Sequence, residues 1–474
     1  MTSQQEVIQA SPTKAFFVEM LTRDIELEDA ILDLLDNCID GVHRTQKQSE
    51  MDDTSDISYS DFWARIDIKQ DSFEIKDNCG GIPLETARNY AFRMGRPAEL
   101  SIDEEFYTIG TYGIGMKRSI FKMGKSAVVI SSHESNAFQV SFTSEWLTED
   151  QTWELPMQTL DNHSDGNGTT IIVTNLYDSI ARRFDPQDGT LLNNLSNRIS
   201  QYYSFIIQKG FRVYLNNQEI KPRKIELLSD NTDNSIKIEP YLYKNSKEEV
   251  EIDIAVGFYR ANASEKEVED ELQGKRRTTE EAGWTIVCND RVVVYCDKTR
   301  LTGWGEFGVP NYHTQFIAIK GIVHFRSKKA RLLPITTTKR GIDPGSDIYL
   351  YTRKFMIEGL KIFTTYTNKW KKYSSEEKEQ SKKAIPQTIQ TISETVANSN
   401  NWKKVQNRSQ EKRYIPKLPM PPSENQDNNQ TIQFVKPREE VQIVSEFLFE
   451  DENRPPAEVG KACFQYVLDL DNKE

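Results

Sequence analysis

Residues 27–41 have the sequence LEDAILDLLDNCIDG, in which apolar and acidic positions recur with the period of an α-helix. Asp33, Asn37 and Asp40 share one face, and Asp29 and Asp36 lie beside them. Such a row of oxygen ligands suits Mg²⁺ and a polyphosphate, although a solvated acidic face has the same pattern. The i, i+3, i+4, i+7 spacing predicts that the other face is buried, through Leu27, Ala30, Ile31, Leu34, Leu35 and Cys38.

A second motif, DNCGGIP, occupies residues 77–83 and follows two runs of alternating residues, 64–68 and 73–76. The alternation predicts a hairpin that delivers Asp77 to the end of a strand. Gly80 and Gly81 would then let the backbone approach a flat ligand closely. An ordinary glycine turn is the alternative interpretation.

Two further motifs contain glycine. The sequence GTYGIGMK at residues 110–117 leads into an amphipathic helix expected over residues 116–123. Glycines before a helix N-terminus present N–H groups and a positive dipole end to an anion, and Lys117 adds charge. The spacing does not match a P-loop. The other motif, GTTIIV at residues 168–173, is a glycine-threonine turn that opens an apolar strand.

Taken together and in this order, the motifs resemble the Bergerat-type ATP-binding fold of the GHKL superfamily. That superfamily includes gyrases, the ninety-kilodalton heat-shock chaperones, histidine kinases, MutL mismatch-repair proteins and MORC ATPases. The opening SPTKAFF at residues 11–17 makes the MORC, heat-shock and MutL branch the best match. The resemblance is specific over residues 11–180 and weaker to about residue 345. It implies an α/β fold whose first domain is a two-layer α/β sandwich, with ATP and Mg²⁺ as cofactors.

The resemblance also implies roles for individual residues. Asp33 would be the general base that orients the attacking water, and Asn37 would be the Mg²⁺ ligand. Asp77 would accept the adenine amino group, Gly81 would give the base room, and Thr169 would support Asp77. The phosphates would be held by Gly110, Gly113, Gly115, Met116 and Lys117.

Two positions depart from the family pattern. The base is usually Glu, so Asp33 is one methylene short, and a misplacement of about 1 Å can slow catalysis about a hundredfold. We therefore expect slow hydrolysis, with Asp36 as the alternative base. Cys79 stands where the D-x-G-x-G pattern has its first glycine, and we expect it to be a small buried residue.

The predicted organisation begins with an ATP-binding domain over residues 1–180 and a transducer-like α/β domain over residues 185–345. In related transducer domains a lysine reaches the γ-phosphate. Lys339 is the best match here, with Arg340 as the substitute, while an exposed loop lysine is the alternative. Three smaller parts follow: a basic amphipathic helix over 346–383, a polar linker expected to be disordered over 384–436, and a small helical docking segment over 437–474.

Composition agrees with a cytoplasmic protein. The five cysteines form no C-x-x-C pair, and the chain has no apolar run long enough for a membrane span. The net charge of −12 argues against a surface that binds DNA everywhere. Residues 320–383, however, hold 16 Lys and Arg against 6 Asp and Glu. With Trp370 and Tyr373 between them, these cations could contact DNA, or they could belong to a solvated helix.

The sequence therefore predicts an ATP- and Mg²⁺-dependent hydrolase of the GHKL type. It would form a nucleotide-dependent homodimer and act as a clamp or switch. Its target would be DNA, contacted through residues 320–383, or a partner protein, contacted through residues 439–470. The alternatives are a nucleotide-gated adaptor with little turnover and a heat-shock-like chaperone that acts on client proteins.

Overall fold

The chain divides into two compact units, Met1–Pro421 and Pro422–Glu474. The computed structural model describes residues 13–47, 58–95, 113–149, 152–161, 166–232, 234–273, 281–336, 339–398, 402–404, 411–421 and 435–471. In these ranges no helix is both long enough and apolar enough to cross a membrane.

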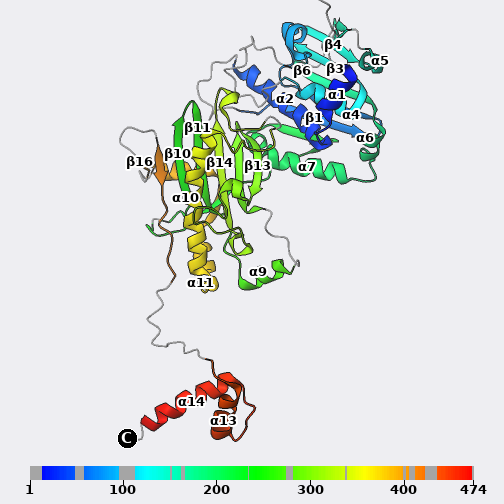
Figure 1. Ribbon diagram of the computed structural model, residues 1–474. Coiled ribbons are helices and arrows are strands. Elements are labelled where there is room, and N and C mark those ends of the chain that lie inside the picture. The colour runs from blue at the N-terminus through cyan, green and yellow to red at the C-terminus, as the bar shows by residue number, and fades with distance from the viewer. Residues whose placement is uncertain are drawn as a thin grey trace, which may run out of the picture. The chain divides into compact units, whose positions relative to one another are not determined.

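The first unit begins with an eight-stranded sheet in the order β5-β4-β3-β6-β2-β1-β7-β8 (Figure 1). Strands β1 and β2 form the predicted antiparallel hairpin, with Ala64 opposite Asp77, so that Asp77 ends β2. The strands are β1 Trp63–Lys69, β2 Ser72–Asp77, β3 Gly124–His133, β4 Asn136–Phe142, β5 Met157–Thr159, β6 Gly168–Leu176, β7 Arg212–Leu215 and β8 Gln218–Glu219.

Helices pack on this sheet and enclose one apolar core with it. Helix α2 buries every apolar position predicted for it, from Leu27 to Cys38, and each fully buried aliphatic side chain contributes about 1.5–3 kcal/mol. The predicted two-layer α/β sandwich is therefore confirmed. The helices are α1 Lys14–Thr22, α2 Leu27–Lys47, α3 Leu84–Thr86, the π-helical turn Ala87–Ala91, α4 Gly115–Met123, α5 Ser144–Thr148, α6 Asp178–Arg183, α7 Thr190–Tyr202 and α8 Ser204–Gln208.

The first sheet extends further along the chain than the predicted boundary at residue 180. Strand β7 pairs in parallel with β1, where Trp63 lies opposite Arg212, and the β7–β8 hairpin therefore belongs to the first sheet. Helices α7 and α8, which precede β7, are interrupted at Tyr203. A parallel pairing between residues so far apart in sequence leaves no local signal.

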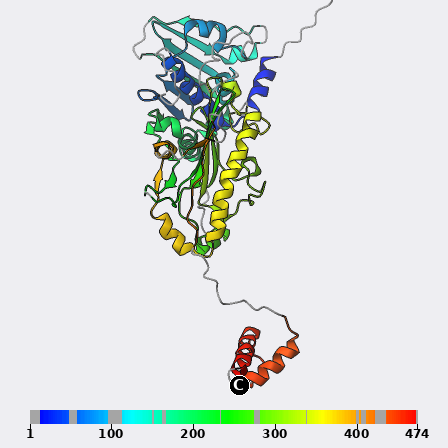
Figure 2. The same ribbon diagram turned by 90° about the vertical axis from the view of Figure 1, so that its left-hand side faces the viewer.

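The second sheet has seven strands in the order β13-β12-β14-β11-β10-β17-β16. Helix α10, Asp347–Trp370, lies along one face of it (Figure 2). The expected second α/β domain is thus present. Its strands are β10 Tyr241–Lys247, β11 Val250–Phe258, β12 Gly283–Cys288, β13 Arg291–Asp297, β14 Ile319–Arg326, β16 Lys403–Lys404 and β17 Lys412–Tyr414.

Much of the linker expected over residues 384–436 has regular structure instead. Strand β15, Ile385–Gln387, pairs with β9, Leu227–Ser229, and β17 pairs with β10. Between these strands, helix α12, Ile389–Asn398, buries Ile392 and Val396 against the second sheet. These two apolar residues lie four positions apart and therefore on the same face of the helix. The polar composition of the segment obscures this short pattern in the sequence.

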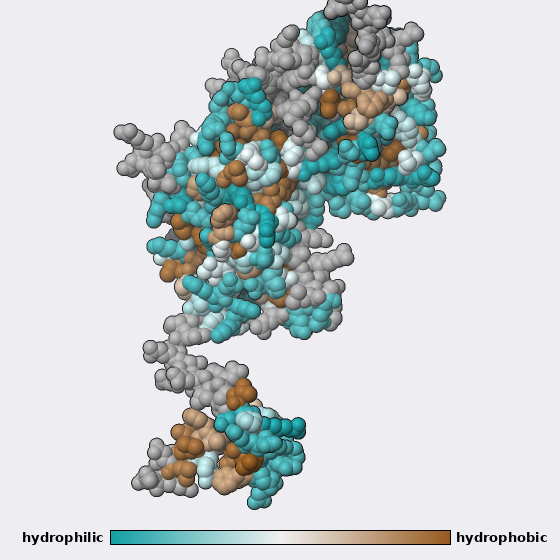
Figure 3. All heavy atoms as spheres, viewed as in Figure 1, coloured by the Kyte–Doolittle hydropathy of each residue, from teal (hydrophilic) through white to brown (hydrophobic). Residues whose placement is uncertain are grey.

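The second unit contains the two predicted helices, α13 Arg438–Phe449 and α14 Pro456–Asp471. Among its described side chains, Ser445 and Val459 are the buried ones. Large apolar side chains lie on its surface (Figure 3). They include Ile443, Phe447, Phe464, Tyr466, Val467, Leu468 and Leu470.

Candidate active site

The acidic face of α2 is buried, which excludes the solvated-face interpretation. Asp33, Asp36 and Asp40 are exposed to only 3%, 1% and 5%. Buried carboxylates are costly unless cations and hydrogen bonds compensate them. The partners of these side chains therefore define the site.

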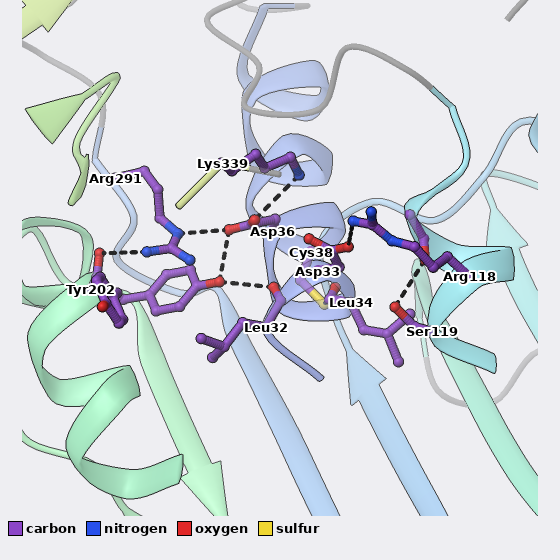
Figure 4. A network of polar contacts seen from close by, with 12 residues as sticks. Leu32, Asp33, Leu34, Asp36, Cys38, Arg118, Ser119, Tyr202, Arg291 and Lys339 are labelled. Atoms are coloured by element: carbon purple, nitrogen blue, oxygen red, sulfur yellow. Dashed lines mark hydrogen bonds and ion pairs between the residues drawn. The ribbon is translucent and has the colours of Figure 1, made fainter. Parts of the chain in front are cut away.

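Asp36 is the most enclosed of these carboxylates and has three partners (Figure 4). Its Oδ1 accepts from Arg291 Nε at 2.9 Å and from the Tyr203 hydroxyl at 2.7 Å, and its Oδ2 accepts from Lys339 Nζ at 3.2 Å. Burial would raise the pKa of Asp36, but Lys339 and Arg291 lower it below its ordinary value. Asp36 is thus a paired carboxylate with a lowered pKa, which disfavours it as the alternative base.

Asp33 faces the beginning of α4 and forms an ion pair with Arg118 (Figure 4). Gly115, the first residue of α4, lies so close that a Cβ there would be 3.8 Å from the Asp33 carboxylate. Burial raises the pKa of Asp33, although Lys339 and Arg118 oppose this change. A buried carboxylate with a raised pKa beside a helix N-terminus has the properties of a general base.

The Asp77 carboxylate is held at the end of β2 by main-chain donors. Its Oδ1 accepts from Cys79 N at 2.8 Å and from Thr169 N at 3.3 Å, and its Oδ2 lies 3.4 Å from Cys38 Sγ on α2. Burial raises the pKa of Asp77 despite these hydrogen bonds. Cys79 is itself buried, as expected, and supplies one of the donors through its backbone.

Close backbone contacts surround Asp77. Gly81 has φ of +72°, and a Cβ there would lie 1.9 Å from Ser132 O. A Cβ on Gly168 would lie 2.1 Å from Asp77 O. Ser131 of β3 connects the glycine turn with β6. Its hydroxyl accepts from Ile82 N at 2.8 Å and lies 3.1 Å from Thr169 Oγ1. Only glycine fits at these crossings.

Lys117 is 2% exposed and is bound to the backbone. Its Nζ donates to Ala91 O at 2.9 Å and also to Gly113 O. Burial lowers the pKa of Lys117 to about 8. Gly113 has φ of +68°, and Met116 is half-buried in the first turn of α4. Gly110 lies outside the described residues.

Asn37 is half-buried one turn after Asp33 on α2. Its amide oxygen is a hard ligand of the kind that Mg²⁺ accepts. In the described ranges no three His, Cys, Asp or Glu side chains gather as a metal site. One protein oxygen together with phosphate oxygens is a usual arrangement for Mg²⁺, so the residues present fit this ion.

Lys339 belongs to a loop of the second domain and reaches α2. The loop is closed by the Ile335–Ile342 bridge and by Thr336 N, which donates to Gly341 O at 3.0 Å. Arg340 forms an ion pair with Asp29, which also binds Arg198 at 2.7 Å. Lys339 is therefore an enclosed residue at the acidic helix, and the exposed-loop alternative is excluded.

Several residues at this site were not predicted from the sequence. Arg118 follows Lys117 on α4, and its pairing with Asp33 depends on how α4 packs against α2. Arg291 lies in an Asn-Asp-Arg turn that the sequence marks only as a turn. Tyr203, which donates to Leu32 O at 2.8 Å as well as to Asp36, lies in a stretch of sequence without any distinguishing pattern.

Part of the basic stretch at residues 320–383 is neutralised by ion pairs within the chain. Lys320 binds Glu281 at 3.0 Å, Arg326 binds Asp253 at 2.8 Å and Lys329 binds Glu249 at 2.8 Å. Trp370 is 4% exposed and donates to Pro419 O at 3.2 Å, so that it cannot stack on bases.

Comparison with known proteins agrees with this geometry. The family model described as "Histidine kinase-, DNA gyrase B-, and HSP90-like ATPase" matches residues 25–170. No curated protein matches the chain. The matched range runs from the residues before α2 to the first residues of β6, and it includes Asp33, Asp77 and the start of α4. Residues 25–170 are therefore similar to the ATPase domains of the GHKL superfamily.

Proposed function

We propose that this protein hydrolyses ATP and that its ATPase domains dimerise when nucleotide binds, so that it acts as a clamp or switch on a macromolecular target. The main support is the position of Lys339. This residue comes from the second domain, yet its Nζ lies 3.2 Å from Asp36 on the acidic helix of the first. A change at the nucleotide site would thus be transmitted to the second domain through this contact.

In this proposal Asp77 recognises the adenine. Its Oδ1 is held by the backbone N–H groups of Cys79 and Thr169, and its Oδ2, which accepts from the Cys38 thiol at 3.4 Å, would use its other lone pair to accept from the exocyclic amino group. Guanine presents a carbonyl oxygen at that position and would be repelled. Gly81 and Gly168 keep the neighbouring backbone close to the plane of the base.

The phosphates would lie at the N-terminus of α4, where Gly113, Gly115 and Met116 offer backbone N–H groups. Asn37 would hold Mg²⁺ against the phosphate oxygens. When bound, this ion neutralises charge that develops on the transferred phosphoryl group. Lys117 would contribute by fixing the path of the backbone at Gly113, to which its Nζ is bound.

Asp33 would take the proton of the attacking water as the terminal phosphoryl group moves to that water, with ADP leaving. Arg118 would fix the orientation of the carboxylate through their ion pair. A shorter side chain than Glu reaches less far, and we therefore expect slow turnover. A nucleotide-gated adaptor with little turnover is the second candidate, favoured by this pairing of a short carboxylate with an arginine.

For the target, the observations favour a protein over DNA. The ion pairs of Lys320, Arg326 and Lys329 leave less positive charge for phosphates, and the chain carries a net charge of −12. DNA binding depends on uncompensated cations. The surface of the second unit offers exposed apolar side chains, as client or partner binding requires. A heat-shock-like chaperone remains within this proposal as one form of protein target.

The proposal is tested by measuring solution mass and phosphate release together, with ATP, ADP and adenosine 5′-(β,γ-imido)triphosphate. We expect dimers with the imido analogue, monomers with ADP, and phosphate release from ATP. Binding of the analogue without dimers or phosphate release would favour the gated adaptor. Absence of binding would contradict both.

We further infer that residues 438–471 dock in an apolar groove with a basic rim on a separate protein. A helical pair of fewer than about 40 residues without its own core needs a partner. Residues 435–471 carry nine acidic and four basic side chains, a net charge of −5. A second copy of the pair would bring like charges together, whereas a basic rim complements them.

This docking is tested on the full chain with a helical peptide of leucine and lysine as the probe. We expect Phe447→Ser combined with Phe464→Ser to weaken peptide binding about thirtyfold or more, because truncating anchors of an apolar face costs more than about 1 kcal/mol each. Phe307→Ser, at a side chain of the first unit that is 71% exposed, is the matched control. Equal losses in both variants, or nucleotide-independent dimers abolished by the double substitution, would contradict the inference.

A further inference from the structure

The partners of Asp36 come from three separate parts of the chain: Tyr203 follows α7, Arg291 begins β13, and Lys339 lies in the 335–342 loop. These contacts connect the acidic helix with the second domain at one carboxylate. The three partners differ in how firmly they are bound to Asp36, and this difference indicates which partner can leave Asp36 for another anion.

The Arg291 side chain is buried and has several partners. Its side chain is 5% exposed, its Nη1 donates to Val292 O at 2.7 Å, and its guanidinium lies 4.3 Å from the ring centre of Tyr203. Together with the Tyr203 hydroxyl it occupies Oδ1 of Asp36. This part of the network keeps Asp36 neutralised whether or not Lys339 is present.

Lys339 is attached less firmly. Its side chain is 12% exposed, and it contacts the other oxygen, Oδ2, at the longer distance of 3.2 Å. Asp33 also contributes to the electrostatic field at Lys339, after Asp36. Lys339 therefore interacts electrostatically with the carboxylate proposed as the base, while among the described residues its ion pair is with Asp36 alone.

The backbone of the loop is anchored independently of Lys339. Arg340, the residue after Lys339, forms an ion pair with Asp29. The backbone N–H of Lys339, which does not involve its side chain, donates to Thr336 O at 2.9 Å. The loop can thus stay on α2 while the Lys339 side chain exchanges its anion.

We propose that Asp36 and the terminal phosphate of ATP compete for Lys339, which makes Asp36 a positioning residue that sets the threshold for the response of the second domain. This inference rests on the proposed function, since it requires ATP at the site. Arg291 and Tyr203 lower the energetic cost of the exchange, because Asp36 keeps these two partners after Lys339 leaves it. ADP has no terminal phosphate and leaves Lys339 with Asp36.

The test is a double-mutant cycle in which the dissociation constants of ADP and the imido analogue are measured by calorimetry. The variants are Asp36→Asn, Lys339→Met and their combination. We expect Asp36→Asn to tighten analogue binding about tenfold, as expected for coupled residues in one network, and to leave ADP binding unchanged. In the Lys339→Met background, Asp36→Asn should have no effect on the analogue.

Asp36→Asn leaves Arg291 buried beside a neutral side chain and can prevent folding. In that case Asp36→Asn is combined with Arg291→Met, which removes the buried guanidinium that Asp36 neutralised, and the cycle is repeated in both Lys339 backgrounds. The same tenfold tightening, dependent on Lys339, is expected.

Equal effects of the Asp36 change in both Lys339 backgrounds, or equal effects on ADP and the analogue, would overturn the inference and identify a purely structural ion pair. If the wild type binds the analogue and the Asp36→Asn variant binds it with the same affinity, the inference alone is overturned. Wild-type protein that binds neither nucleotide overturns the proposed function, and the competition with it.

Discussion

Asp77→Asn is expected to weaken ATP binding about a hundredfold or more, because a site left with an unpaired polar group rejects its ligand by a large factor. The substituted side chain keeps an oxygen for Cys79 N and Thr169 N, whose bonds to Oδ1 are 2.8 and 3.3 Å. Its NH₂ group then replaces Oδ2, so that a donor faces the adenine amino group. Calorimetry with ATP measures the loss.

The matched control for this prediction is Asp71→Asn, at an exposed carboxylate in the turn between β1 and β2. It should bind ATP with wild-type affinity. The melting temperature of Asp77→Asn should stay close to that of the wild type, since Asn preserves the bonds to the two backbone donors. Wild-type affinity in a folded Asp77→Asn protein would place the adenine elsewhere.

Asp33→Asn is expected to preserve ATP binding and to lower the rate of phosphate release by a factor of about 10²–10⁴, the usual contribution of a general base. The amide has nearly the same size, so the close contact with Gly115, where a Cβ would lie 3.8 Å away, is retained. It cannot accept the proton of the attacking water. Phosphate release and analogue affinity, measured on the same preparation, separate catalysis from binding.

Asp33→Glu is the informative partner of this variant, because it restores a carboxylate that reaches one methylene further. Its rate should be at least that of the wild type. Undiminished hydrolysis by Asp33→Asn would move the base to another residue. Asp36 is disfavoured, since Arg291 and Tyr203 occupy its Oδ1 whether or not Lys339 leaves Oδ2.

Local patterns in the sequence were sufficient for the elements that carry the site. The period of the apolar residues predicted α2, the alternation before Asp77 predicted the β1–β2 hairpin, and the glycines before Lys117 predicted the start of α4. The same kind of pattern predicted α13 and α14. Each of these signals arises from neighbours within about one or two helical turns or a single hairpin, which is the range over which periodicity reports.

The partners of these elements became known only from the tertiary structure. An acidic helix face has the same sequence whether water or Arg118, Arg291 and Lys339 neutralise it, and 303 residues separate Lys339 from Asp36. The burial of Trp370 and the strand pairing of residues 385–387 and 412–414 likewise became known only from the structure, because both depend on residues distant in the chain. Local sequence specifies which face of an element is apolar, whereas long-range packing decides which charges meet and which of them are removed from water.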